Sequence, residues 1–573
     1  MLDVVIRGGE VVDGTGAPRR RADVGVKDGR IVRVGRVDGE ATTVIDATGK
    51  VVTPGFIDVH THIDAQAFWD PALTPSSLHG VTTVFAGNCG FSIAPLSDDP
   101  ADADYLLRML ARVEGMPAES LRLGVPWNWR STEGYFDALE GALGINAGFM
   151  VGHSAIRRVV MGANATVRPA NTDELAAMKR LLHDGLAAGA IGFSSSLSRA
   201  HNDADGAMVP SRYSTPEELV ELCRVLSQYE GTSIEFNPCT SATPFDSWST
   251  DLTTAISVAA QRAVNWNALF VKAGNADYCQ RKLELSDHAR AHGGRVIALT
   301  VPINTGARLN FRSGFVYDAV PGWEDVMLAP LETRLAQFRD TAVRAKLAES
   351  AAKPHTMTAA TAWADLIIFD TFAPENQQYR GARLADIARD QGHSPFEALA
   401  DIVVADELNT CFGSHAEEES VDDWNERLEI WRDPRTVIGA SDAGAHLDLL
   451  ALFNYPTVML GRAVRERALL PLEEAVHLLT DRPAQLYGLR ERGRVVDGWF
   501  ADLVVLDEAR VGSTDLEMRY DLPGDAGRLY ADATGIDHVF CNGVAVVSGG
   551  VLTGARAGKV MRAGRDTGTP SFD

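Results

Sequence analysis

Residues 51–62 read Val-Val-Thr-Pro-Gly-Phe-Ile-Asp-Val-His-Thr-His, a short apolar run that ends in two histidines one residue apart. Apolar and β-branched residues that follow a Pro-Gly turn predict a buried strand over 56–62. Alternate side chains of a strand share a face, so His60 and His62 should point toward the same place. Two imidazoles that converge at a strand end supply half of a metal site. The alternative is a pair of hydrogen-bonded core histidines, and other parts of the chain favour the metal site.

The composition is that of a globular protein, with 573 residues of which 45% are hydrophobic and 23% charged. This length allows one large catalytic domain and a smaller one. The net charge of −23 disfavours nucleic acid and anionic membranes as partners. Six scattered cysteines without a C-x-x-C pair form no disulfide framework, and no signal-peptide pattern or membrane-spanning apolar run is visible. These features predict a cytoplasmic protein.

The middle of the chain alternates apolar stretches with helical ones, which predicts a (β/α)8 barrel. The expected strands are 56–62, 82–86, 147–152, 190–194, 233–237, 264–271, 296–301 and 437–440, and the clearest helices between them are 172–188, 216–229 and 279–292. The gap before the last strand is too long for a plain connection. We therefore expect an insertion over approximately 303–430, with helices over 324–350 and 395–406.

Both ends of the chain have the pattern of short strands separated by glycine-containing turns. Residues 1–50 predict a small antiparallel unit, and strands of the same kind recur after residue 500. Each end carries too little core to be stable alone, so the two should pair into one small β-sandwich. The expected domains are residues 1–53 and 486–573 for the sandwich and 54–485 for the barrel.

Catalytic groups of a barrel lie at the carboxyl ends of its strands. Cys89 follows the second strand, where a thiolate can ligate zinc, although a small buried thiol under a glycine-rich turn is the alternative. His153 follows the third strand and either orients substrate or bonds to the backbone. Asp442 directly follows the eighth strand and can act both as metal ligand and as general base, or else cap a helix. His446, four residues later, is expected to support the ligands or to contact substrate.

Several motifs together resemble the amidohydrolase superfamily, and more narrowly its N-acyl-D-amino-acid deacylase (D-aminoacylase) branch. They are Pro54-Gly-Phe-Ile-Asp-x-His-x-His62, Gly80-Val-Thr-Thr83, Gly87-Asn-Cys-Gly90, Gly152-His-Ser154 and Ser441-Asp-Ala-Gly444. The resemblance implies a distorted (β/α)8 TIM-like barrel, a β-sandwich built from both termini, and a zinc-activated water that attacks an amide carbonyl. It also implies that His60, His62 and Asp442 hold one metal position and that Cys89 belongs to the other.

The chain departs from that branch where the branch has a ligand histidine at the ends of strands 5 and 6. Glu235 and Asn237 stand at the first place, and Asn265 and Asn267 at the second. Of these, Glu235 is the residue able to serve as a further metal ligand. We expect substrate contacts from His153, Asn267 and His446, and also from Asn304, which lies where the branch binds the substrate carboxylate.

The resemblance leads to a metal-dependent amidohydrolase that cleaves a small-molecule amide, an N-acyl amino acid and in particular an N-acyl-D-amino acid. It would use one zinc ion or two, or another divalent metal, with Asp442 as general base. One alternative is a hydrolase of a cyclic amide or of another C–N or C–O bond. Another is a metal-poor binding protein on the same scaffold. Assembly into a homo-oligomer is compatible with the resemblance.

Overall fold

The computed structural model describes residues 1–238, 244–271, 274–304, 306–312, 316–355, 357–414 and 419–572. Its centre is a sheet in which eight parallel strands pair in chain order. They are β6 (Phe56–Asp58), β7 (Val81–Ala86), β8 (Asn146–Gly152), β9 (Gly192–Ser196), β10 (Ser233–Asn237), β11 (Val264–Leu269), β12 (Val296–Thr300) and β16 (Thr436–Ile438). Each overlaps a strand predicted from the sequence, and the barrel expectation is confirmed.

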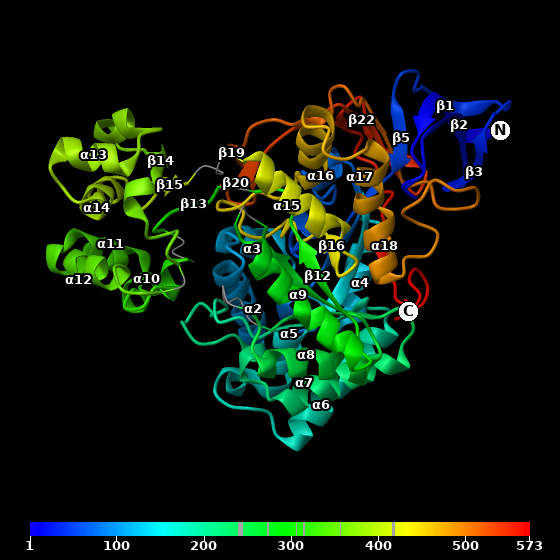
Figure 1. Cartoon of the computed structure of the whole chain (residues 1–573). Helices are drawn as coiled ribbons and strands as arrows, with labels where there is room; N and C mark the ends of the chain where they lie inside the picture. Colours follow the sequence, from blue (N-terminus) through cyan, green and yellow to red (C-terminus); the bar gives the residue numbers. More distant parts are fainter. Residues whose placement is uncertain are drawn as a thin grey trace.

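Helices between the strands lie around the outside of this barrel (Figure 1). They include α5 (His153–Met161), α6 (Thr172–Ala187), α7 (Pro216–Val225), α8 (Ser247–Ala260) and α9 (Ala276–Ala291). Helix α6 begins where the sequence predicts, because the side chain of Asn171 accepts from the backbone N–H of Glu174 and Glu174 bonds back to Asn171. No described helix combines the length and the apolar character needed to cross a membrane.

The first and last strands of the barrel meet just beyond their ends. Thr61 and Ala443 form a parallel bridge. The backbone N–H of Asp442 donates to the carbonyl of His60 at 3.2 Å, and that of His62 donates to Ala443 at 2.7 Å. Strand β6 therefore ends at Asp58, four residues earlier than predicted, because the backbone around the two histidines bonds to the turn after β16.

Both ends of the chain contribute to one nine-stranded sheet. Its strands are β1 (Leu2–Val11), β2 (Arg20–Lys27), β3 (Arg30–Gly35), β4 (Ala41–Asp46), β5 (Val51–Pro54), β17 (Leu503–Leu506), β22 (Ile536–Cys541), β23 (Val544–Ser548) and β24 (Val551–Leu552). Antiparallel pairing of β5 with β17 joins the two ends. The wholly antiparallel arrangement predicted for residues 1–50 is wrong, since β4 runs parallel to β1. After β1, β2 and β3, which pair antiparallel in that order, the chain crosses to the other edge of β1. Strand β4 pairs there and runs in the same direction as β1.

A separate lobe lies between β12 and β16 in the chain (Figure 1). It has a sheet of β13 (Arg308–Leu309), β15 (Cys411–Gly413) and β14 (Ile367–Asp370), and helices α10 (Glu324–Met327), α11 (Leu331–Arg339), α12 (Thr341–Ala351), α13 (Leu384–Gln391) and α14 (Pro395–Ala405). Its core is its own and includes Phe311, Trp323 and Phe412. The single helix predicted over 324–350 is three helices, because the chain breaks before Leu331 at Pro330 and restarts at Asp340, whose side chain caps α12.

Candidate active site

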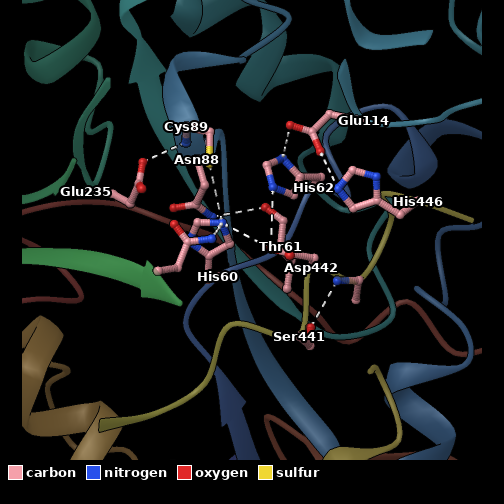
Figure 2. Close-up of polar contacts among 12 residues, drawn as sticks. His60, Thr61, His62, Asn88, Cys89, Glu114, Glu235, Ser441, Asp442 and His446 are labelled. Atoms are coloured by element: carbon pink, nitrogen blue, oxygen red, sulfur yellow. Dashed lines mark hydrogen bonds and ion pairs between the residues drawn. The ribbon is translucent and has the colours of Figure 1, made fainter. Parts of the chain in front are cut away.

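His60 and His62 lie at the carboxyl end of the barrel, directly after β6. Their side chains are buried, and their ring centroids are 5.3 Å apart with the planes steeply inclined. In both residues Nε2 is the nitrogen that faces Asp442 (Figure 2). The structure thus brings together the two imidazoles that the strand spacing predicts to converge.

Asp442 reaches the same point from the other side of the barrel closure. Its Oδ1 atom lies 3.2 Å from Nε2 of His60 and 3.8 Å from Nε2 of His62. The turn that carries Asp442 can approach His62 because Gly444 has a φ of +93°, and a Cβ there would lie 2.5 Å from the carbonyl oxygen of His62. Ser441 donates a short hydrogen bond to Asp58 and thereby ties this turn to the end of β6.

Cys89 joins this group from the turn after β7. Its Sγ atom lies 3.7 Å from Nε2 of His60, and ligand atoms of His60, His62 and Cys89 all lie within 4.8 Å of one another. The turn needs Gly87, which has a φ of +78° and packs where a Cβ would lie 2.6 Å from the carbonyl oxygen of Met150. The side chain of Cys89 is therefore held at the barrel mouth by the local backbone.

Glu235 in β10 and Asn267 in β11 contact this group in different ways. Oε2 of Glu235 accepts from the backbone N–H of Cys89 at 2.6 Å, so one carboxylate oxygen supports the turn (Figure 2). Asn267 places its amide nitrogen 3.1 Å from Nε2 of His60. Both side chains lie beside the site, and their predicted roles as ligand and substrate contact stay predictions.

Two of the residues expected to contact substrate are not brought to this group. His153 is fully buried, with Nδ1 2.8 Å from Oγ of Ser195 and Nε2 2.8 Å from Oε1 of Glu218. Both of its ring nitrogens are therefore already bonded within the protein. Asn304 lines a different cavity, together with Arg308, Asn454 and Ser513 among others.

Glu114 is a residue of the site that the sequence did not indicate. It follows α2 (Pro100–Val113), is 3% exposed, and lies between two imidazoles. Its Oε1 atom is 3.6 Å from Nδ1 of His62, and its Oε2 atom is 3.8 Å from Nε2 of His446 (Figure 2). The Glu-Gly pair at this point is typical of any helix end, so the sequence carries no signal for it. His446 thus lies beside Glu114, and its predicted role stays a prediction.

His201 is a second residue that the sequence did not indicate. It lies in the segment after β9, where its ring packs edge-on against Phe91 at 5.0 Å and its Nδ1 atom is 2.9 Å from Oγ of Ser196. It is near enough to His60 and His62 that a charge on its ring lowers the pKa of both. Its position in an irregular segment leaves no periodicity by which it could have been found.

The electrostatics of the site follow mainly from burial. Burial lowers the pKa of His60 to about 3 and that of His446 to about 4, so both rings are neutral near pH 7. Burial raises the pKa of Asp442 to about 7, with a further contribution from the charge of Asp58, and raises that of Glu235 to about 8. Burial, together with the charges of nearby carboxylates, also raises the pKa of Glu114 well above its usual range.

These groups fit a divalent cation. Three buried carboxylates, those of Asp64, Glu114 and Glu235, and the partly exposed carboxylate of Asp442 lie close enough to influence one another. Within the described part of the chain none of them is paired with Lys or Arg. Neutral imidazole, carboxylate and thiolate are the ligands that zinc prefers. Such ligands at tetrahedral angles around zinc are about 3.3–3.6 Å apart. The separations here, 3.2, 3.7 and 3.8 Å, are close to that range.

Comparison with known proteins agrees with this geometry. Residues 43–550 match the model of the Amidohydrolase family. Two proteins of Alcaligenes xylosoxydans xylosoxydans are similar along nearly the whole chain. A D-aminoacylase is 28% identical in an alignment that covers 98% of this chain and 97% of the relative. An N-acyl-D-glutamate deacylase is 29% identical in an alignment that covers 100% of this chain and 99% of the relative.

Solved structures of related proteins give the same picture. A D-aminoacylase structure, 29% identical, covers 98% of this chain and 100% of its own with a TM-score of 0.64. An N-acyl-D-glutamate deacylase from Bordetella bronchiseptica, 26% identical, has the same coverage and TM-score. That protein was solved with zinc and a phosphonate inhibitor that mimics the tetrahedral intermediate of its reaction.

Proposed function

This chain belongs to the amidohydrolase family and is a metal-dependent hydrolase of the amide bond in N-acyl amino acids, and we propose that its substrates are N-acyl-D-amino acids. The observation that carries the hydrolase assignment is the proximity of Asp442 to both His60 and His62 at the barrel mouth. The similarity to a D-aminoacylase and an N-acyl-D-glutamate deacylase supports the D configuration of the substrate. The donor set suits zinc, and another divalent metal with similar preferences would fit as well.

We assign His60, His62 and Asp442 as ligands of the ion, and we place Cys89 beside these ligands. A divalent ion held by these residues would polarise the amide carbonyl and lower the pKa of the attacking water from 15.7 toward about 7. Burial keeps both imidazole rings neutral, so each has one lone pair that it can offer to the ion. In this proposal Asp442 would accept the proton of the attacking water and return it to the leaving nitrogen, so that one carboxylate serves both halves of the reaction.

The experiment is a panel of N-acetyl-D-amino acids, their L enantiomers and cyclic amides, assayed with zinc-loaded protein by release of the free amine. The proposal expects turnover of N-acetyl-D-amino acids in preference to their enantiomers. Turnover of the L enantiomers alone would reject the stereochemical assignment while keeping the reaction class. Asp442→Asn identifies any background activity, with Asp137→Asn, an exposed residue on α4 (Thr132–Leu139), as its matched control.

A second candidate, hydrolysis of a cyclic amide or another C–N or C–O bond, is favoured by one observation. Where the D-aminoacylase branch is expected to have two ligand histidines, this chain has Glu235, which bonds to the backbone of Cys89, and Asn267, which lies beside His60. Such replacements change the shape and polarity of the pocket next to the ion. Turnover confined to the cyclic amides of the panel would select this candidate.

A further inference from the structure

Glu114 places its carboxylate between two imidazoles at the edge of the site. Oε1 faces Nδ1 of His62 at 3.6 Å, and Oε2 faces Nε2 of His446 at 3.8 Å (Figure 2). The residue is 3% exposed, so water does not compete effectively for either oxygen. Removing a carboxylate from water is costly, and a buried one needs partners that offset the cost. Its two facing imidazoles are such partners.

The consequence for His62 follows from imidazole chemistry. A neutral imidazole has one N–H and one lone pair, and the group facing one nitrogen decides which nitrogen keeps the proton. A divalent cation in the site would offset the charges of the neighbouring carboxylates and keep Glu114 ionised. An ionised carboxylate only accepts hydrogen bonds, so Glu114 would favour the proton on Nδ1 of His62. That tautomer leaves the lone pair on Nε2, the atom that faces Asp442. His60 differs, because within the described chain its Nδ1 atom has no hydrogen-bond partner.

The backbone holds Glu114 where it can act on this side of the site. Its carbonyl oxygen accepts from the backbone N–H of His446 at 2.5 Å. Gly115 packs against the same residue, since a Cβ on Gly115 would lie 3.4 Å from Cα of His446. The end of α2 is therefore attached to the segment that follows Asp442, by side chain and by backbone.

We propose that Glu114 is a positioning residue. It sets the tautomer and orientation of His62 through Nδ1, and it holds the segment from Asp442 to His446 against that ring. The proposal rests on the proposed function in so far as His62 is a metal ligand. Carboxylates that bond to the outer nitrogen of a ligand histidine typically change metal affinity about 10- to 100-fold when they are replaced.

The test compares Glu114→Gln and Glu114→Asp with wild-type protein and with Glu119→Gln, a matched change on the exposed face of α3 (Ala118–Gly124). Zinc dissociation constants are measured on the whole zinc-free protein by competition with a chromophoric chelator. Glu114→Gln should bind zinc about 10- to 100-fold more weakly. Glu114→Asp, which keeps the charge, should recover part of the loss, and Glu119→Gln should match wild type. At saturating zinc the KM of Glu114→Gln should stay close to the wild-type value.

Zinc affinity of Glu114→Gln within twofold of wild type would overturn the proposal. If the Gln variant does not fold, as judged by circular dichroism of the zinc-free form, Glu114→Asp decides: weaker zinc binding supports the proposal and unchanged binding overturns it. A wild-type protein that binds zinc through His60 but hydrolyses no N-acyl amino acid would refute the proposed function, while the affinities would still decide the role of Glu114. A wild-type protein that binds no zinc would overturn both.

Discussion

The Oδ1 atom of Asp442 lies 3.2 Å from Nε2 of His60, although Asp442 follows the last strand of the barrel and His60 follows the first. The same two residues are joined through their backbones, since the N–H of Asp442 donates to the carbonyl of His60. The contacts that close the barrel between its first and last strands therefore also bring the candidate metal ligands together. A change that opens the bridge between Thr61 and Ala443 should weaken both the barrel closure and the metal site.

Asp442→Asn should lower kcat by about 100- to 10,000-fold, because the amide cannot accept the proton that the mechanism assigns to the carboxylate. The thermal unfolding midpoint should stay close to that of Asp137→Asn, since the change is isosteric. The measurement is steady-state hydrolysis of the best substrate at saturating zinc. Activity at the wild-type level would remove Asp442 from the mechanism.

His60→Ala should empty the site. Both Oδ1 of Asp442 and Sγ of Cys89 lie less than 4 Å from Nε2 of His60. Loss of this imidazole therefore removes the candidate ligand that is close to both of the others. Zinc per chain, measured by inductively coupled plasma mass spectrometry after dialysis, should fall well below the wild-type value. His393→Ala, a change at an exposed side chain, is the control. Equal zinc content in His60→Ala and wild type would rule out the ligand role of His60.

Cys89→Ala should reduce zinc content less than His60→Ala does. The thiol lies next to His60, but the three residues assigned to the ion remain when it is removed. The backbone bond from Cys89 to Glu235 also survives, so the turn should keep its shape. Metal analysis of the two variants side by side makes the comparison. A site emptied by Cys89→Ala alone would mean that the ion occupies the position nearer the thiol.

His79 should make the protein less stable in acid. Burial lowers its pKa to about 4, while Nδ1 and Nε2 contact Thr457 and the carbonyl of Ala531. In the unfolded chain the imidazole of His79 takes up a proton near pH 6.5. In the native state it takes up this proton only near pH 4. Stability is therefore full above pH 6.5 and falls by up to about 3 kcal/mol as the pH drops toward 4.

His79→Gln removes this titration, so the gap between its thermal midpoint and that of wild type should narrow from pH 7 to pH 5. His393→Gln, at an exposed position, should show no such change in its gap. A constant gap for His79→Gln across this pH range would show that the ring takes up its proton at the same pH in the folded and the unfolded chain, and that burial does not lower its pKa.

The lobe between β12 and β16 should be separable from the barrel. The chain enters and leaves the lobe at neighbouring positions. Arg308 of β13 pairs with Gly413 of β15, and the N–H of Ser414 donates to the carbonyl of Ala307 at 3.1 Å. Replacing residues 309–412 by a short Gly-Ser linker should leave a folded barrel that still binds zinc. Insoluble protein, or the loss of zinc binding from soluble protein, would show that the lobe is part of the barrel's structural unit.

The sequence predicts the barrel well because its strands are short apolar runs bounded by turn residues. It also places His60, His62, Cys89 and Asp442 at strand ends, where parallel strands bring side chains together. The parallel pairing of β4 with β1 could not be predicted, since it depends on a crossover between strands of similar composition.

Contacts made by residues outside the strands could not be predicted from the sequence either. Glu114 reaches the site from the end of α2, and only the three-dimensional packing places that helix end beside His446. The two bonds of His153 are hidden for the same reason, because Glu218 comes from α7, far along the chain. Patterns along the sequence report the face on which a residue lies, but not which neighbouring element supplies its partner.

The central claim is that His60, His62 and Asp442 bind one divalent ion between them. Anomalous diffraction at the zinc edge, from crystals grown with zinc, tests it most directly. We expect a peak at about 2.0–2.2 Å from each of Nε2 of His60, Nε2 of His62 and Oδ1 of Asp442. A peak that touches none of these atoms, or an empty site under zinc-replete conditions, would contradict it.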